Sequence, residues 1–239
     1  MKNKPNKFSL ILLCILILTL TCGCSDLKIT EDMQQAIDVY TQAVAQSETR
    51  SEGKVVFNSV TDDKALEFKR TQTTVNFEYT VKDGAVSFVR SDFLDGTESA
   101  KYRSDGSIVE KFDYSNSTWV DVTEENKDFL KASANPFITL SLFRVDNKLR
   151  LRTDYLKDIT MTDENGVKVI TFTLKDKTVS DVLAFYKADG IVRESAGHTR
   201  KYYISSDGYI EKIIINTTQQ IITNGTAGEY ITEMVVECK

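Results

Sequence analysis

The alternation of apolar and polar residues divides the chain into one N-terminal helix followed by a long series of strands. Met33, Ile37, Tyr40 and Val44 recur at spacings of four, three and four residues, which is the repeat of one face of an α-helix. Thr30 precedes this stripe as a candidate N-cap, and two acidic residues follow it at the positive end of the helix dipole. The pattern predicts a helix of about 20 residues, ending near residue 50.

From Gly53 onward the apolar residues alternate with period two, which is typical of strands. The parity of this alternation changes between Phe68 and Val75, so we expect a bulge, a bend or a break at residues 70–74. Seven of the eleven glycines follow Asp or Asn, and these dipeptides are the strongest short-range signal for a β-hairpin turn. One of them, at Gly190, is expected to end a helix instead. The others predict an antiparallel meander.

Two or three short helical segments are expected between the strands, with candidates at residues 123–130, 136–143 and 178–190. The second begins at Pro136, which is tolerated in a first helical turn, and it is apolar on nearly all sides. Such a segment would be buried or would lie over the mouth of a cavity. The chain then returns to strands, predicted at 201–205, 209–217, 219–223 and 229–237.

The N-terminus has the organisation of an export signal. Three lysines form a basic head, and Phe8 to Thr21 runs almost wholly apolar for 14 residues. A membrane-spanning helix needs about 20 apolar residues, so this segment is too short to be one. A basic head, a short apolar segment and small residues at its end predict a secretory signal.

The end of this segment, Leu20 to Ser25, resembles the lipobox of bacterial lipoproteins, with Gly23 at the small position before Cys24. The resemblance implies that Cys24 carries a diacylglycerol with acyl chains such as palmitate, and two chains suffice for stable membrane attachment. Cys22 is a rival acceptor, although the bulky Thr21 before it argues against this. A plain cleaved signal with incidental cysteines is the other alternative.

These signals divide the chain into three parts: a lipoprotein signal peptide at 1–23, a lipidated tether at 24–30, and one domain at 31–239. We expect the mature protein on the outer face of the cell membrane of a Gram-positive bacterium. Removal of the signal takes away three lysines and no acid, which changes the net charge from −5 to −8. An acidic domain without a basic stripe is not expected to bind nucleic acid.

Residues for catalysis are scarce in this sequence. His198 is the one histidine, and we expect it in a loop before a strand. One histidine cannot build a multi-histidine metal site, and neither a Gly-x-Ser-x-Gly motif nor a Gly-rich phosphate loop is present. Cys238 is the one cysteine outside the signal and the lipid site, so no intramolecular disulfide is expected. The sequence therefore predicts no enzyme, no metal and no cofactor.

The order of elements resembles the LolA/LppX/RseB-like lipoproteins, in particular an uncharacterised Gram-positive group with a Lys-Tyr-Tyr-Ile-x-x-x-Gly-Tyr-Ile-like hairpin, here Lys201 to Ile210. The resemblance implies an α+β, mainly antiparallel fold: an unclosed β-barrel with a long N-terminal helix and a few short helices on its concave face. In that fold the concave apolar face commonly holds lipid acyl chains. LolA itself is a soluble shuttle, whereas this chain keeps an anchor.

We therefore predict a membrane-anchored lipoprotein that binds a lipid or another hydrophobic ligand in an apolar half-barrel cavity. The candidate cavity residues share apolar side chains on the helix stripe and on the facing strands: Met33, Ile37, Tyr40, Phe57, Phe68, Phe77, Tyr79 and Phe88. An ordinary hydrophobic core would use the same residues. The alternative hypothesis is a ligand-free interaction or sensor module, like RseB, that regulates a partner protein of the envelope.

Overall fold

The computed structural model describes residues 27–64, 69–126, 156–175, 191–223 and 226–239. Within them one helix, α2, precedes eleven strands. The bounds of these elements are α2 Glu31–Glu48, β1 Glu52–Asp63, β2 Lys69–Lys82, β3 Ala85–Leu94, β4 Thr97–Ser104, β5 Val109–Asp113, β6 Thr118–Asp121, β7 Leu156–Glu164, β8 Val167–Leu174, β9 Ile191–Ile204, β10 Ile210–Thr223 and β11 Thr226–Cys238.

The predicted N-terminal helix is confirmed, together with its cap. Thr30 has an extended backbone, and its hydroxyl oxygen accepts a hydrogen bond from the Met33 amide at 3.3 Å. Glu31 and Asp32 lie in the first turn, where the helix dipole stabilises negative charge. No helix among the described residues has both the length and the hydropathy to cross a bilayer.

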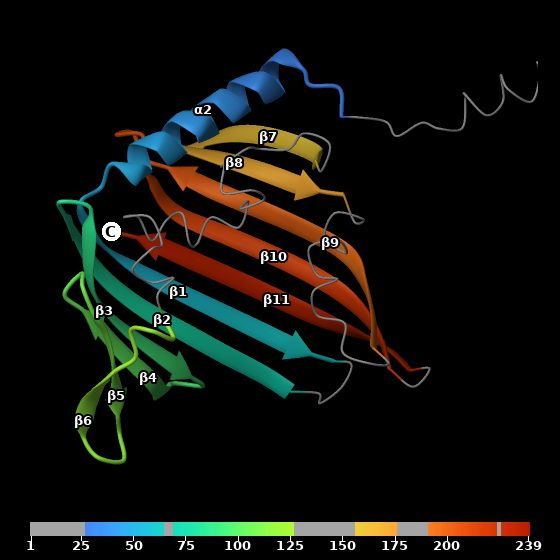
Figure 1. Cartoon of the computed structure of the whole chain (residues 1–239). Helices are drawn as coiled ribbons and strands as arrows, with labels where there is room; N and C mark the ends of the chain where they lie inside the picture. Colours follow the sequence, from blue (N-terminus) through green and yellow to red (C-terminus); the bar gives the residue numbers. More distant parts are fainter. Residues whose placement is uncertain (1–26, 65–68, 127–155, 176–190, 224–225) are drawn as a thin grey trace, which may run out of the picture.

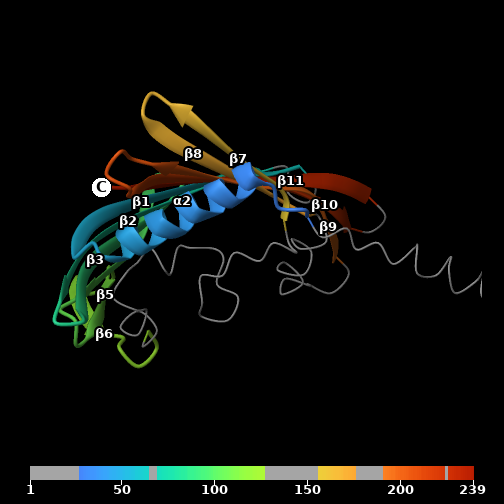
Figure 2. The same ribbon diagram turned by 90° about the horizontal axis from the view of Figure 1, so that it is seen from above.

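All the described strands belong to one antiparallel sheet with the order β6-β5-β4-β3-β2-β1-β11-β10-β9-β8-β7. The sheet does not close, because β6 and β7 are its two ends in this order. Strands β3 to β6 curl toward the side on which α2 lies (Figures 1 and 2). The predicted fold, a mainly antiparallel, unclosed barrel with a long N-terminal helix, is confirmed by this arrangement.

The Asp-Gly and Asn-Gly signals mark hairpins, as predicted. Asp83 and Gly84 have φ of 51° and 80° between β2 and β3, and both residues of such a two-residue turn need φ above zero. The same pattern recurs at Asp95 and Gly96 between β3 and β4, and again at the turn between β7 and β8.

Three sequence expectations need correction. Strand β2 is continuous from Lys69 to Lys82 and pairs with β1 without a register shift, so residues 70–74 hold no bulge or break. Phe68, from which the change of parity was inferred, lies outside the described residues. Strand β10 is likewise unbroken at residues 217–219, although its pairing with β9 shifts register there. His198 lies within β9 and not in a loop, because β9 begins ten residues earlier than predicted, at Ile191.

The predicted helical segments lie largely outside the described residues. Residues 123–126 form a turn, and nothing further of the segments at 123–130, 136–143 and 178–190 is described. The single-domain organisation predicted for 31–239 therefore stays a prediction.

The core forms where α2 packs against the β7–β10 side of the sheet (Figures 1 and 2). Tyr40 of α2 meets Phe172 of β8 and Tyr202 of β9 edge to face, with ring centroids 5.0 and 4.8 Å apart. All three side chains are nearly inaccessible to solvent. Burial of each ring removes a large apolar area from water, and edge-to-face contact adds a smaller directional term.

Ser47 fixes the C-terminal end of α2 to the sheet. Its hydroxyl donates to the Ala43 carbonyl at 2.7 Å and accepts from the Ile210 amide, at the start of β10, at 3.0 Å. Ser47 has no exposed surface, so its hydroxyl is the buried partner of a backbone amide that comes from 163 residues away in sequence. This bond aligns the end of the helix with the turn between β9 and β10.

Replacement of Ser47 by alanine is expected to destabilise the fold by about 1–3 kcal/mol, because the Ile210 amide loses its buried acceptor. Urea unfolding of the Cys24→Ser chain measures this loss. Thr41→Ala is the matched control: its hydroxyl also bonds within the helix, to Ile37, but it is exposed, so a change within about 0.5 kcal/mol is expected. Equal losses in the two variants would contradict a special role for Ser47.

Candidate functional site

The candidate site is the face of the sheet against which α2 packs, called the inner face. Because directly paired residues of an antiparallel sheet point to the same side, the register assigns residues to this face strand by strand. Its central apolar members are Val55 and Phe57 of β1, Val75 and Phe77 of β2, Met234 and Val236 of β11, and Ile213 and Ile215 of β10.

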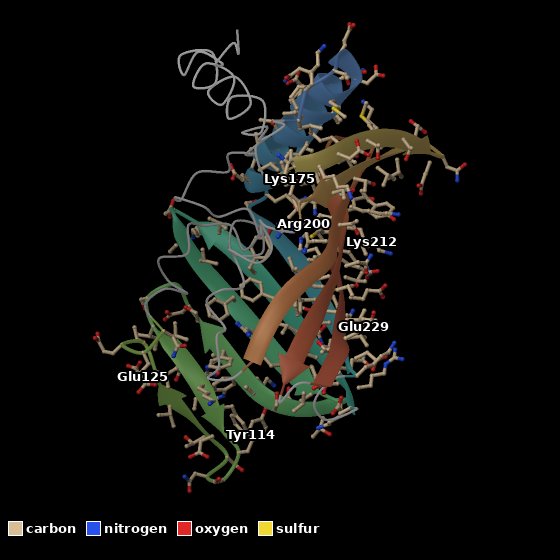
Figure 3. The ribbon with its side chains drawn as sticks, turned by 90° about the vertical axis from the view of Figure 1, so that its right-hand side faces the viewer. Tyr114, Glu125, Lys175, Arg200, Lys212 and Glu229 are labelled. Atoms are coloured by element: carbon tan, nitrogen blue, oxygen red, sulfur yellow. The ribbon has the colours of Figure 1, made fainter. Side chains whose placement is uncertain are left out.

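The inner face remains partly accessible at β1, β2 and β11. Phe57, Val75, Phe77 and Met234 are each only half-buried, whereas the inner-face residues that pack near α2 at β8 and β9, such as Phe172, are buried. The opposite face carries charged residues among its apolar ones. Lys212, for example, points away from the concave side in Figure 3. The sheet therefore presents an accessible apolar surface on its concave side.

The candidate residues from the sequence separate into two groups on this face. The helix residue Tyr40 packs at β8 and β9, and Met33 and Ile37 lie partly buried against the core. On the strands, the ring of Phe77 stacks on that of Phe88, with centroids 5.2 Å apart, and lies 6.0 Å from the ring of Tyr79. Phe57 lies on the same face.

Burial distinguishes packing residues from surface residues among these candidates. Tyr40, Tyr79 and Phe88 are 3–5% exposed, so they serve mainly to pack the core. Phe57 and Phe77 keep accessible surface. Phe68 and Cys24 lie outside the described residues. Val75 and Met234 were not among the sequence candidates for the accessible inner face. Each lies two residues along its strand from another apolar residue, Phe77 or Val236, and this spacing places both on the same face.

A row of polar side chains lies on the inner face next to the apolar residues. It crosses the sheet from β2 to β9 through paired residues: Thr71, Thr61, Thr232, Thr217 and His198. The hydroxyl oxygens of Thr61 and Thr232 lie 3.4 Å apart. The apolar surface is thus bounded by hydroxyl groups along one side.

His198 and Arg200 form a buried polar pair next to this row. Arg200 Nε donates to His198 Nε2 at 2.8 Å, and His198 Nδ1 lies 2.8 Å from the Thr217 hydroxyl. Since Nε2 accepts, the neutral imidazole carries its proton on Nδ1 and donates to Thr217. Arg200 also donates to the Tyr202 hydroxyl. Figure 3 shows Arg200 on the concave side of the sheet.

The environment of these groups shifts their ionisation. The pKa of His198 is lowered to about 3, mainly by burial and to a smaller extent by the positive charge of Arg200. Burial raises the pKa of Tyr202, and it raises that of Tyr40 well above its usual value. Burial also raises the pKa of the Cys238 thiol to about 12. A neutral histidine and protonated tyrosines inside a hydrogen-bonded network fit a structural role, so His198 is not placed to act as a catalytic base at neutral pH.

One hollow among the described residues lies at the end of β1, β2 and β3. It has a volume of about 690 Å³, and its lining mixes Tyr79 and Phe88 with Glu52, Lys54 and Glu78. Lys54 and Glu78, which are directly paired on β1 and β2, form an ion pair at 2.7 Å. Within the described ranges, no three His, Cys, Asp or Glu side chains come close enough to hold a metal ion.

Comparison with known proteins finds fold similarity alone. No model of a known family matches this chain, and no curated protein matches it. Similar solved structures include LprF from Mycobacterium bovis, at 10% identity and a TM-score of 0.45, covering 86% of this chain and 92% of that one. LppX from Mycobacterium tuberculosis has 10% identity and a TM-score of 0.43, covering 86% and 94%.

A LolA superfamily protein from Nitrosomonas europaea has 11% identity and a TM-score of 0.28, covering 85% of this chain and 91% of that one. These are LolA/LppX-like half-barrel proteins, the group that the order of elements in the sequence resembles.

The neutral state of His198 predicts a pH dependence of stability. The unfolded imidazole has a pKa near 6.5 and the folded one about 3, so the unfolded chain binds more protons as the pH falls below about 6.5. The free energy of unfolding should therefore decrease on acidification, by up to about 1.4 kcal/mol per pH unit in the steepest part.

Unfolding measurements between pH 7 and 4.5, on the wild-type chain and on His198→Gln, check this. Other groups titrate alike in both proteins, so the difference between the two pH profiles of unfolding free energy reports the contribution of the imidazole. Parallel pH profiles would show that folding leaves the pKa of His198 unchanged, which would contradict this prediction.

Proposed function

We propose that this chain is an extracytoplasmic lipoprotein, anchored through Cys24 to the outer face of the cell membrane, that holds a lipid or another hydrophobic ligand against the inner face of its sheet. The observation that carries the proposal is the half-buried apolar surface formed by Phe57, Val75, Phe77 and Met234 on adjacent strands β1, β2 and β11.

Apolar burial supplies the driving force for such binding. Each square ångström of apolar surface removed from water contributes roughly 25 cal/mol, and large apolar surfaces on soluble domains mark binding sites. The side chains of Phe57, Val75, Phe77 and Met234 give acyl chains an apolar surface that extends over three adjacent strands. The tether places this surface beside the membrane from which a lipid would come.

The test is native mass spectrometry, with lipid extraction, of the Cys24→Ser chain expressed with its export signal in a Gram-positive host. We expect the spectrum of the otherwise unchanged chain to show one discrete additional mass, that of the bound ligand. Phe77→Asp should reduce its occupancy roughly tenfold or more, because a buried carboxylate against an acyl chain is strongly unfavourable. Val75→Asn, which lies outside the Phe77–Phe88 aromatic contact, should reduce it as well.

The matched control is Asn76→Asp. It introduces the same carboxylate one residue away, on the opposite face of β2, so the bound mass should persist. Near-ultraviolet circular dichroism confirms that each variant is folded. A wild-type chain that carries no ligand would contradict the proposal and would favour the alternative, a module that regulates an envelope protein partner.

A further inference from the structure

One row of paired residues on the inner face changes from apolar to cationic as it leaves the centre of the sheet. In the register, Val55 of β1 pairs with Phe77 of β2, Phe77 with Arg90 of β3, Arg90 with Tyr102 of β4, and Tyr102 with Lys111 of β5. All five side chains therefore point to the concave side. The apolar surface of the proposed site continues directly into two cations.

The two cations lie on either side of one aromatic ring. The guanidinium carbon of Arg90 is 5.7 Å from the centre of the Tyr102 ring, and the Lys111 ammonium is 5.8 Å from it. Asp92, two residues along β3, receives a bidentate ion pair from Arg90 at 2.7 and 2.9 Å. This pair holds the guanidinium in place and offsets one charge, so Arg90, Asp92 and Lys111 together carry a net positive charge.

The arrangement stays accessible to a ligand. The side chains of Arg90 and Asp92 are 25% and 18% exposed, and Lys111 is exposed. Arg200, a further inner-face cation, differs because it is 5% exposed and donates to His198 and Tyr202. Of these three inner-face cations, a ligand on the apolar surface can therefore reach Arg90 and Lys111.

We infer that the ligand of the inner face is an anionic amphiphile, whose charged headgroup lies at Arg90 and Lys111 and whose apolar chain runs over Phe77 toward Phe57 and Val75. This inference rests on the proposed function and adds the ligand class and its direction along the sheet. Charge complementarity supports it. The mature domain is strongly acidic, so an anion would be repelled by most of its surface and attracted at this place.

The test uses the full chain carrying Cys24→Ser, with N-phenyl-1-naphthylamine as a neutral fluorescent probe of the apolar surface. Oleate and oleyl alcohol, which share one chain and differ in headgroup charge, compete for the probe. We expect oleate to compete roughly tenfold better at low salt, with the advantage shrinking at high ionic strength. Acetate, which has the charge but no chain, should not displace the probe.

Lys111→Gln should lower the oleate advantage about threefold, and Arg90→Gln combined with Lys111→Gln should abolish it, while oleyl alcohol competes as before. Lys101→Gln is the matched control, because Lys101 precedes Tyr102 on β4 and points to the outer face. It removes the same charge and should leave the oleate advantage unchanged.

The outcomes separate this inference from the proposed function. Failure of the neutral probe and of both oleyl compounds to bind would overturn the proposed function itself. Binding of oleate and oleyl alcohol with equal affinity, or equal effects of Lys101→Gln and Lys111→Gln, would leave the apolar site intact and overturn the headgroup assignment. Displacement of the probe by acetate alone would show that an anion binds there without an apolar chain. This result would also overturn the headgroup assignment.

Discussion

The pairing of β1 with β11 is the contact on which the whole sheet depends. It joins the strands that follow α2 to the strands that end the chain, and it sets Phe57 opposite Val236. Without it, β1 to β6 and β7 to β11 would form two separate sheets, each with an exposed edge where β1 and β11 now meet. This long-range pairing also carries the apolar surface across β11, β1 and β2, so the proposed binding face exists only when the two halves meet.

One helix cannot cover a sheet of this width. Strand spacing is about 4.8 Å, whereas a helix with its side chains is about 10 Å across, so α2 covers only part of an eleven-stranded sheet. It packs mainly at the β7–β10 side, where Tyr40 meets Phe172 and Tyr202. The half-buried residues of β1, β2 and β11 form the surface that α2 leaves partly accessible. The same residue types therefore build a closed core at one side and a partly accessible apolar surface at the other.

Polar groups on the inner face fall into two kinds with different consequences. His198 and Arg200 are buried and hydrogen-bonded to each other, His198 also to Thr217 and Arg200 also to Tyr202. A buried network of this kind adds specificity and a sensitivity to acid. Arg90 and Lys111 are accessible and lie beside an aromatic ring. The first kind stabilises one arrangement of the sheet, and the second gives the proposed site a direction.

The sequence by itself determined the local features of this protein. The stripe from Met33 to Val44 and the cap at Thr30 predicted α2, and Asp-Gly turns predicted hairpins, because both depend on residues only a few positions apart. The tertiary structure decided which strands become neighbours, that Phe57 and Phe77 stay accessible while Tyr79 and Phe88 are buried, and that Phe77 lies in one row with Arg90 and Lys111. Those facts depend on the register between strands and on where a single helix rests, and both are set by contacts between residues far apart in the chain.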